Sequence, residues 1–395
     1  MSVTFAQGFR AGGIVAGLKP SGRPDLALLV ADRPCAAAAV FTTNAFPAAP
    51  VVLSRGRLAT GRAQAILVNS GQANAATGSR GRGDAERATD AAAAALEVDP
   101  SLVLAASTGV IGRPIPMRTL LDGIQPLAAS LSPDGGAAFA EAITTTDTVP
   151  KVATAGRRHW RTGGCAKGVG MIAPNLATML AFVTTDAPLS PASARALVTG
   201  VLEPIFESLT IDSSTSTNDS VFLLASGAAG GAAVEPGSPG WADLASTMED
   251  VGTSLVEQLA GDAEGGTHIL VVEVAGAAAD EDARRVARAI AESPLVKTAV
   301  FGGDPNPGRI LQAIGSSGVP FDPDLVGATI GHVPVIAAGQ IDPAYFAGAG
   351  DAARRAMKER TVVVEVSLGT GPGRGRILGC DLSYEYVRIN GEYTT

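Results

Sequence analysis

The sequence predicts an α/β fold of the α+β kind, in which stacked mixed or antiparallel sheets are covered by helices. Short β-like runs and helical runs alternate along the 395 residues, a length that fits two domains or one large domain with a smaller one attached. Some strands follow one another with only a turn between them, which disfavours a strict alternation of strand and helix. Hydrophobic residues make up 46% of the chain and charged residues 17%, so a large packed core is expected.

The individual elements follow from apolar runs, turn residues and helix formers. Strands are expected at Leu26 to Ala31, Ala37 to Thr43, Ala65 to Asn69, Leu102 to Ala106, His268 to Val274 and Thr361 to Ser367. Helices are expected at Asp84 to Leu96, Pro191 to Val201, Trp241 to Leu259 and Asp280 to Ala291, the first of them with Asp84 as its N-cap. The clearest boundary lies near Gly276 to Asp282, so a smaller C-terminal α/β domain is expected over about residues 280–395.

Charge and hydropathy disfavour nucleic acid and membrane as partners. The formal net charge of −8 is spread without long blocks of one sign, and Arg80, Arg82 and Arg87 are expected at a solvated helix entrance. The first ten residues lack a basic region followed by an apolar run, and the apolar stretches are short and broken by Gly, Pro or charge. We therefore expect a cytoplasmic protein.

The sequence offers little support for a metal or nucleotide cofactor. The three cysteines, Cys35, Cys165 and Cys380, lie far apart without a CxxC pair and are expected to be buried thiols. None of the three histidines stands in a serine-hydrolase or HExxH setting. The glycine-rich runs at 163–170 and 369–375 lack the spacing of a phosphate loop or a dinucleotide-binding turn. The chemistry is therefore expected to need neither metal nor cofactor.

The most informative segment is KGVGMIAPNLATMLAFVTTDA, residues 167–187. A glycine-rich turn leads to Ala177 and Thr178, and the apolar run after them is expected to continue as a buried strand. If the chain is cut between these two residues, the new α-amino group can act as the base for the Thr178 hydroxyl. Its reference pKa of about 7.7–8.0 leaves a useful neutral fraction near physiological pH. The residues alone leave a second interpretation open, in which Thr178 only begins a core strand.

A resemblance over nearly the whole chain bears on this choice. The segment resembles the cleavage motif of the ornithine acetyltransferase family of arginine biosynthesis, also described as bifunctional glutamate N-acetyltransferases. The similarity continues in NSGQANAATG at 69–78, ASTGVIGRPIPM at 106–117, TTDTVPK at 145–151, TSTNDS at 215–220, SPLVKTAVFGGDPNPGRI at 293–310 and YVRINGEYTT at 386–395. So many ordered motifs make the resemblance specific, and it implies the layered sandwich of this family and of related aminopeptidases.

The resemblance implies self-cleavage between Ala177 and Thr178, which gives an alpha chain of residues 1–177 and a beta chain of residues 178–395. It makes Thr178 the nucleophile and Thr108 and Gly109 the oxyanion hole. The residues implied to contact substrate are Thr145, Lys167, Thr178, Glu264, Asn390 and Thr395. Their chemistry suits an amino acid, because an ammonium such as that of Lys167 can pair with a carboxylate, and a carboxylate such as that of Glu264 with an amine.

The implied function is transfer of an acetyl group from N-acetylornithine to glutamate through an acetyl-threonine ester, with ornithine released. The two chains are expected to stay together, in an assembly of two of each. The sequence leaves open whether acetyl-CoA also serves as acetyl donor. The alternatives are a related self-cleaving amidase or aminopeptidase, an acetyltransferase of secondary metabolism, and a non-catalytic relative.

Four departures from the family pattern put details of the pocket in doubt. Ala263 replaces a usual glycine, His268 a common lysine and Pro307 a usual tryptophan, and Ser213-Ser214 replaces a usual Gly-Asp. The nucleophile and the oxyanion pair are retained, so the departures bear on substrate preference.

Overall fold

The computed structural model describes residues 2–157, 159–172 and 179–392. The chain divides into two compact units, one formed by Met1–Glu207 and Ser214–Leu259, the other by Ser208–Ser213 and Ala260–Thr394. The expected boundary near residue 280 lies later in the chain than the start of the second unit. The second unit begins earlier because the strand Ile269–Gly276 is a central strand of its sheet.

Unit 1 is built on an eight-stranded sheet of order β4-β3-β2-β8-β7-β6-β5, with β1 paired to β2. Its strands are β1 (Phe9–Ile14), β2 (Leu26–Phe41), β3 (Arg62–Gln72), β4 (Val103–Val110), β5 (Lys151–Gly156), β6 (Arg161–Lys167), β7 (Leu180–Thr185) and β8 (Ser220–Ala225). The pairs β3–β4 and β7–β8 are parallel and the others antiparallel, so the sheet is mixed as the sequence predicts.

Strand β2 joins two halves of this sheet, one formed with β1, β3 and β4 and the other with β8, β7, β6 and β5. Its first part pairs with β1 and β3, its second part pairs with β8, and the register with β3 shifts between Val30 and Cys35. One apolar cluster contains side chains of both halves, among them Ile66 of β3, Phe182 of β7 and Phe222 of β8. The two halves are therefore stacked across a common core, which is the expected sandwich.

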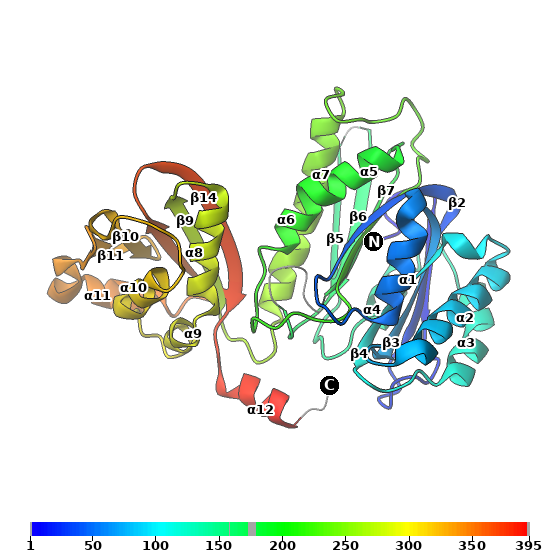
Figure 1. Ribbon diagram of the computed structural model, residues 1–395, viewed down its shortest axis with the longest axis horizontal. Coiled ribbons are helices and arrows are strands. Elements are labelled where there is room, and N and C mark those ends of the chain that lie inside the picture. The colour runs from blue at the N-terminus through cyan, green and yellow to red at the C-terminus, as the bar shows by residue number, and fades with distance from the viewer. Residues whose placement is uncertain (1, 158, 173–178, 393–395) are drawn as a thin grey trace. The chain divides into compact units, whose positions relative to one another are not determined.

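The helices of unit 1 cover this sandwich (Figure 1). They are α1 (Ala49–Arg57), α2 (Gly78–Leu96), α3 (Met117–Ala129), α4 (Gly136–Ala142), α5 (Pro191–Leu197), α6 (Glu203–Phe206) and α7 (Trp241–Gly261), with the short turns η1 (Leu58–Thr60), η2 (Pro100–Leu102) and η3 (Val198–Leu202). Figure 1 shows α2 and α3 side by side, and both pack on a second apolar cluster with β2, β3 and β4. Helix α7 packs on β6, where Gly164 leaves room for Val251 and Leu255.

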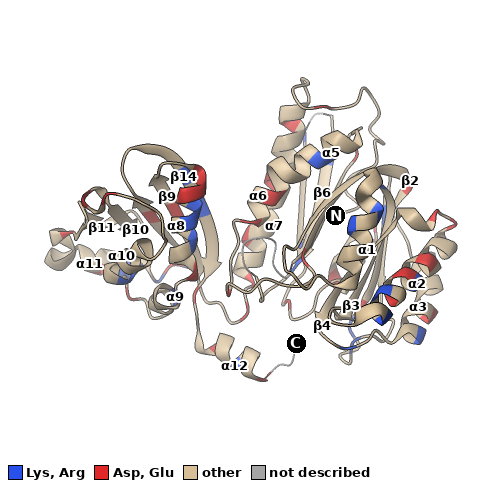
Figure 2. Cartoon of the chain, viewed as in Figure 1, with Lys and Arg blue, Asp and Glu red and all other residues tan. Residues whose placement is uncertain are grey.

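The expectation that Asp84 is an N-cap was wrong. Helix α2 begins at Gly78, and Asp84 lies in its interior, where it is buried and pairs with Arg80 and Arg87. The glycines weaken the helical pattern of the first turns, but Gly81 is required there, since a Cβ at this position would lie 1.9 Å from Thr77 Oγ1. Figure 2 shows that basic and acidic residues are interspersed along α2.

Unit 2 is built on a six-stranded sheet of order β12-β11-β10-β13-β9-β14. Its strands are β9 (Ile269–Gly276), β10 (Gly327–Ile330), β11 (Val333–Ala337), β12 (Gln340–Ile341), β13 (Thr361–Ser367) and β14 (Gly371–Cys380). Its helices are α8 (Asp280–Glu292), α9 (Pro294–Phe301), α10 (Pro307–Gly315), α11 (Gly350–Ala356) and α12 (Tyr384–Glu392), with the turns η4 (Pro323–Leu325) and η5 (Tyr345–Ala349). The apolar faces of α8 and α10 and the sheet share one core.

The cysteines, the apolar helices and the potential metal ligands bear on the kinds of chemistry expected from the sequence. Cys35, Cys165 and Cys380 are buried free thiols, as the sequence predicts. None of the helices in the described residues is long and apolar enough to cross a membrane. Among the described residues, no group of three or more His, Cys, Asp or Glu is placed to hold a metal ion.

The core of unit 1 centres on Phe182, which stacks on Phe222 at 5.5 Å between ring centroids and meets Phe139 edge-on at 5.1 Å. We expect Phe182→Ala to lower the free energy of unfolding by about 3–5 kcal/mol, because the cavity removes the packing of β7 against Phe222 of β8 and Phe139 of α4. Urea denaturation measures the change. The matched control Phe46→Ala, at a ring that is 76% exposed, should change it by less than about 0.5 kcal/mol. Equal losses in both variants would contradict this account of the core.

Candidate active site

The strands β3 and β4 bring two glycines face to face at their ends. Gly71 and Gly109 are register partners with φ values of +131° and +123°, a backbone conformation that favours glycine. A Cβ on Gly109 would lie 2.3 Å from the carbonyl carbon of Gly71. The backbone at Thr108-Gly109, the predicted oxyanion pair, is therefore fixed by close packing that no other residue type allows.

Lys167, the last residue of β6, brings three of the predicted site residues together. Its Nζ donates to Thr145 Oγ1 at 2.8 Å and to Thr108 Oγ1 at 3.2 Å. Lys167 is only 2% exposed, so these contacts are made in a desolvated place where they are stronger than in water. Because Thr108 accepts this hydrogen bond, the proton of its hydroxyl remains available for an oxyanion.

Asp147 supplies negative charge to this buried cluster. Its carboxylate lies 2.6 Å from Lys151 Nζ and 4.0 Å from Lys167 Nζ, and it accepts hydrogen bonds from the backbone N–H groups of Thr145 (3.0 Å) and Gly168 (2.8 Å). Burial by itself raises the pKa of Asp147, but the two ammonium groups and the hydrogen bonds outweigh it and lower the pKa to about 2. Asp147 is therefore ionised at neutral pH and holds both lysines and the Thr145 loop in place.

Next to Thr108, polar side chains form hydrogen bonds with buried backbone carbonyl groups and with each other. Asn218 Nδ2 donates to the carbonyl oxygens of Ser107 at 2.8 Å and Ala73 at 2.7 Å. Ser107 Oγ in turn donates to Asn69 Oδ1 at 2.6 Å. These contacts tie the end of β4 to the segment before β8, so Thr108 is held from both sides.

Asp219 fixes the residue that follows the predicted nucleophile in the chain. Its Oδ1 accepts a hydrogen bond from the Met179 N–H at 2.8 Å, and Ser220 N donates to the Met179 carbonyl at 3.1 Å. Oδ2 is buried without a hydrogen-bond partner in the part of the chain that the structure describes. Burial raises the pKa of Asp219 well above its ordinary value, despite the opposing hydrogen bond from Met179 and the charge of Lys167. The charged form of this carboxyl group is therefore disfavoured by its burial, next to the residue that follows the predicted nucleophile.

Two predicted substrate residues lie in unit 2, where they contact each other. Asn390 Nδ2, on α12, donates to Glu264 Oε2 at 3.2 Å. The start of α12 packs so closely on Gly265 that a Cβ there would lie 2.3 Å from the Tyr386 nitrogen. Ser383 Oγ also donates to the Gly265 carbonyl at 2.6 Å. These contacts set the position of α12, and with it Asn390, against Glu264.

The remaining predicted residues, Ala177, Thr178 and Thr395, lie outside the described residues. The structure thus brings together Thr108, Gly109, Thr145 and Lys167 in unit 1 and Glu264 and Asn390 in unit 2.

The residues that depart from the family pattern can each be placed in the structure. Ala263 is buried, and the ring of His268 lies 3.2 Å from the Asp381 carboxylate. Pro307 occupies the first turn of α10, where its missing N–H costs nothing. Ser213 has a φ of +58°, in the left-handed region. None of these contacts involves Glu264 or Asn390.

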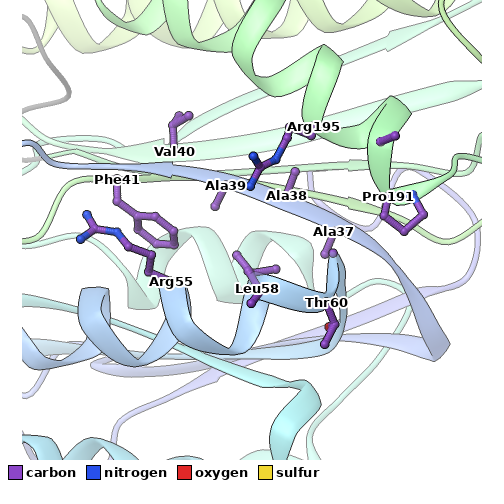
Figure 3. Close-up of a pocket in the computed structure, with 13 residues that line it drawn as sticks. Ala37, Ala38, Ala39, Val40, Phe41, Arg55, Leu58, Thr60, Pro191 and Arg195 are labelled. Atoms are coloured by element: carbon purple, nitrogen blue, oxygen red, sulfur yellow. The ribbon is translucent and has the colours of Figure 1, made fainter.

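A separate pocket of about 410 Å³ lies in unit 1 between α1, α5 and β2 (Figure 3). In Figure 3, Arg55 lies beside Phe41, and its guanidinium carbon is 5.5 Å from the ring centroid. The lining of this pocket contains none of the predicted site residues, so we assign it no part in the chemistry.

Sequence reasoning missed several members of the site. Asp147 and Lys151 stand inside a quoted motif, and their four-residue spacing of opposite charges was the available signal. Asp219 and Asn218 also stand in a quoted motif, but no local pattern shows that they reach Met179 and Ser107.

Comparison with known proteins gives matches over the full chain. The model of the ArgJ family matches residues 10–395. A protein of Thermosynechococcus vestitus called "Arginine biosynthesis bifunctional protein ArgJ" is 49% identical over 415 residues, which cover 100% of this chain and 98% of that relative. A protein of the same name from Thermus thermophilus is 46% identical over 396 residues, 100% of both chains. The solved ornithine acetyltransferase of Mycobacterium tuberculosis, complexed with ornithine, is 45% identical with a TM-score of 0.44, over 45% of this chain and 96% of that one.

The lowered pKa of Asp147 predicts a pH-dependent contribution to stability. The carboxyl is more acidic in the folded state than in the unfolded chain, so its contribution is complete above about pH 4 and is lost as the pH falls through about 2. We expect Asp147→Asn to lower the free energy of unfolding at pH 7 by about 3–5 kcal/mol, because it leaves the Lys151 charge buried. Urea denaturation at pH 7 and at several values between pH 4 and 2 measures both effects.

The matched control is Asp122→Asn, in an exposed pair with Arg118 whose Nε–Oδ2 distance is 3.8 Å. It should change stability by less than about 1 kcal/mol at every pH. If Asp147→Asn unfolds at the same urea concentration as this control, Asp147 does not stabilise the cluster.

Proposed function

The chain belongs to the ArgJ family, and we propose that it is a glutamate N-acetyltransferase that moves the acetyl group of N-acetylornithine to glutamate. One observation carries the proposal. The buried ammonium of Lys167 contacts Thr108 and Thr145, and Lys167 is the register partner of Leu180, two residues after Thr178 in the chain. The same short stretch of strand ends thus carries the oxyanion pair, a cation and the segment that follows the nucleophile.

The proposed chemistry begins with self-cleavage between Ala177 and Thr178, which frees the α-amine of Thr178. This amine takes the proton of the Thr178 hydroxyl as the oxygen attacks the acetyl carbonyl of N-acetylornithine. The C–N bond then breaks, the ornithine nitrogen takes up the proton, and an acetyl-threonine ester remains. The α-amine of glutamate attacks the ester carbonyl and gives a proton to the base. The C–O bond to Thr178 then breaks, the Thr178 oxygen takes up that proton from the base, and N-acetylglutamate leaves. Each half of the cycle restores the protonation state of the base.

Both halves pass through a tetrahedral oxyanion, which we assign to Thr108 and Gly109. The support for this assignment is the fixed backbone at Gly109 and the hydroxyl of Thr108, which accepts from Lys167 and keeps a proton to donate. Donors that are in place before the reaction cost no reorganisation when the charge develops. Asp219, which holds the Met179 N–H, would fix the backbone next to the nucleophile.

We further propose that Thr145, Lys167, Thr178, Glu264, Asn390 and Thr395 contact the substrate. Lys167 suits the α-carboxylate, which donor and acceptor have in common. Glu264 suits the side-chain ammonium of ornithine, and Asn390, which donates to it, would orient its carboxylate. No observation favours the amidase alternative over acetyl transfer.

The two chains, 1–177 and 178–395, are proposed to remain associated, two of each, in a cytoplasmic enzyme. After cleavage the strand pairs β6–β7 and β2–β8 would still hold them together. The relatives are described as bifunctional, and a comparison of N-acetylornithine with acetyl-CoA as donor, with glutamate as acceptor, decides whether this enzyme uses both.

Self-cleavage is tested by the mass of the purified protein. We expect two fragments, residues 1–177 and 178–395, in the wild type and in the exposed control Thr60→Ala. Thr178→Ala should remain a single chain and lose acetyl transfer, because it has no hydroxyl to attack either carbonyl. Fragments of the same masses from Thr178→Ala would falsify the assignment of the nucleophile. Release of free acetate by the wild type, without N-acetylglutamate, would instead support an amidase.

The oxyanion assignment predicts the effect of a shape-conserving change at Thr108. Thr108→Val should lower kcat for acetyl transfer by about 100- to 1,000-fold, because one donor to the oxyanion is lost. Thr108→Ser keeps the hydroxyl and should retain most of the activity. Steady-state kinetics with N-acetylornithine and glutamate measures both variants. A Thr108→Val enzyme within threefold of the wild type would remove Thr108 from the oxyanion hole.

A further inference from the structure

Lys19 is a cation beside the active-site cluster that the mechanism above does not use. It lies in the segment between β1 and β2, and its Nζ donates to the carbonyl oxygens of Thr144 at 2.6 Å and Pro24 at 2.8 Å. Thr144 directly precedes Thr145, whose hydroxyl accepts a hydrogen bond from Lys167. Lys19 and Lys167 therefore approach consecutive residues of one loop.

The segment that carries Lys19 is held in place by a buried carboxylate. Asp25 is fully buried and accepts hydrogen bonds, between 2.5 and 3.1 Å long, from four consecutive backbone N–H groups, those of residues 16–19. Gln72 Nε2 also donates to the Leu18 carbonyl at 3.0 Å. The position of Lys19 is thus determined by main-chain contacts on both sides.

The same segment runs past Gly71, near the end of β3. A Cβ on Gly71 would lie 3.0 Å from the Leu18 oxygen and 3.5 Å from Lys19 Cγ. Gly71 is the register partner of Gly109. The stem of Lys19 therefore lies beside Gly71, on the strand that pairs with the one carrying Thr108 and Gly109.

The ammonium of Lys19 has no carboxylate paired with it among the described residues. Four charged groups act on it: the carboxylates of Asp25 and Asp147 and the cations of Arg23 and Lys167. The Asp25 carboxylate is already occupied by the four N–H groups, and Asp147 by Lys151. Burial first, and then the charges of Arg23 and Lys167, lower the pKa of Lys19 to about 8, while the two carboxylates oppose this shift.

The two hydrogen bonds of the Lys19 ammonium leave its third N–H group able to donate to a ligand. It carries three N–H groups, of which two point to Thr144 and Pro24. A ligand carboxylate would accept the third and supply the missing counter-charge. Arg23, whose Nη2 lies 3.5 Å from Thr144 Oγ1, adds to the positive potential there.

We propose that Lys19 binds the side-chain carboxylate of the acetyl acceptor and so selects glutamate over uncharged amino acids, an inference that rests on the proposed function. The donor N-acetylornithine has one carboxylate and one ammonium, whereas glutamate has two carboxylates. Lys167 suits the α-carboxylate, which both have, so a second cation is what distinguishes the acceptor. Lys19 suits this role, because its Nζ contacts the Thr144 carbonyl, next to the Lys167 contact at Thr145, and no ion pair involves it among the described residues.

The test compares glutamate with glutamine, which has the same shape and no side-chain charge. In Lys19→Met, the ratio of kcat/KM for glutamate to kcat/KM for glutamine should fall by about 10- to 100-fold, the size of one charge-assisted hydrogen bond. Acetylation of the enzyme by N-acetylornithine alone, followed by mass spectrometry, should change less than threefold. Lys19→Arg should keep most of the preference, and the exposed control Lys358→Met all of it.

The pH dependence of the same ratio separates binding from a structural role. Titration of the nucleophile affects both acceptors alike and cancels in the ratio, and the different α-amine pKa values of the two acceptors are the same in the wild type and in Lys19→Met, so the two enzymes are compared with each other. The preference for glutamate should be highest below about pH 8, where Lys19 carries its proton, and fall above it. Lys19→Met should lack the fall near pH 8 that the wild type shows, because its side chain does not titrate.

Two results would overturn the inference while leaving the proposed function intact. One is an unchanged preference for glutamate in Lys19→Met. The other is an equal loss with glutamate, with glutamine and in the acetylation step, which would mean that Lys19 only supports the Thr144 loop. If the wild type transfers no acetyl group to glutamate at all, the proposed function itself fails, and the inference with it.

Discussion

The site depends on keeping one ammonium, that of Lys167, charged inside the protein. A buried charge is costly unless it is paired and hydrogen-bonded. Asp147 meets this requirement at the same time as it binds Lys151 and two backbone N–H groups. Because Asp147 is fixed from four directions, Lys167 can point its remaining donors at Thr108 and Thr145. The proposed oxyanion residue Thr108 and the loop of Thr145 thus both depend on the buried ion pair of Lys167 and Asp147.

The fold provides this arrangement through the path of β2. Since β2 pairs with β3 in its first part and β8 in its second, it joins two half-sheets that stack across a common aromatic core. The stacking brings the end of β4, with Thr108, near the end of β6, with Lys167. The buried Asp219 lies just before β8 and accepts a hydrogen bond from the N–H of Met179, the residue before β7. Residues more than a hundred positions apart in the chain, such as Ser107 and Asn218, then contact each other directly.

The sequence predicted secondary structure well where a hydrophobic period or a run of apolar residues is long. Helix α8 and strand β13 lie within one or two residues of their expected positions. The expectation for Asp84 failed because the first turns of α2 are glycine-rich and look like a loop, whereas close contacts with the preceding residues Asn74 and Thr77 accommodate a helix there. Leu26–Phe41 was expected as two strands because Asp32 to Pro34 interrupts its apolar pattern, yet the backbone continues through it.

What the sequence by itself determined is the family, through ordered motifs along the whole chain, and with it the residues expected to carry the chemistry. It also determined that the fold mixes helices with stacked sheets, because periodicity and turn residues are local properties. Only the tertiary structure decided which charges meet. Three features depend on burial and on distances between remote segments: Asp147 pairs with two lysines, the pKa of Asp219 is raised by burial, and Lys19 lies beside Thr144. Neither the burial of a side chain nor the distance between remote segments can be derived from local sequence patterns, since both arise only when the two half-sheets pack against each other.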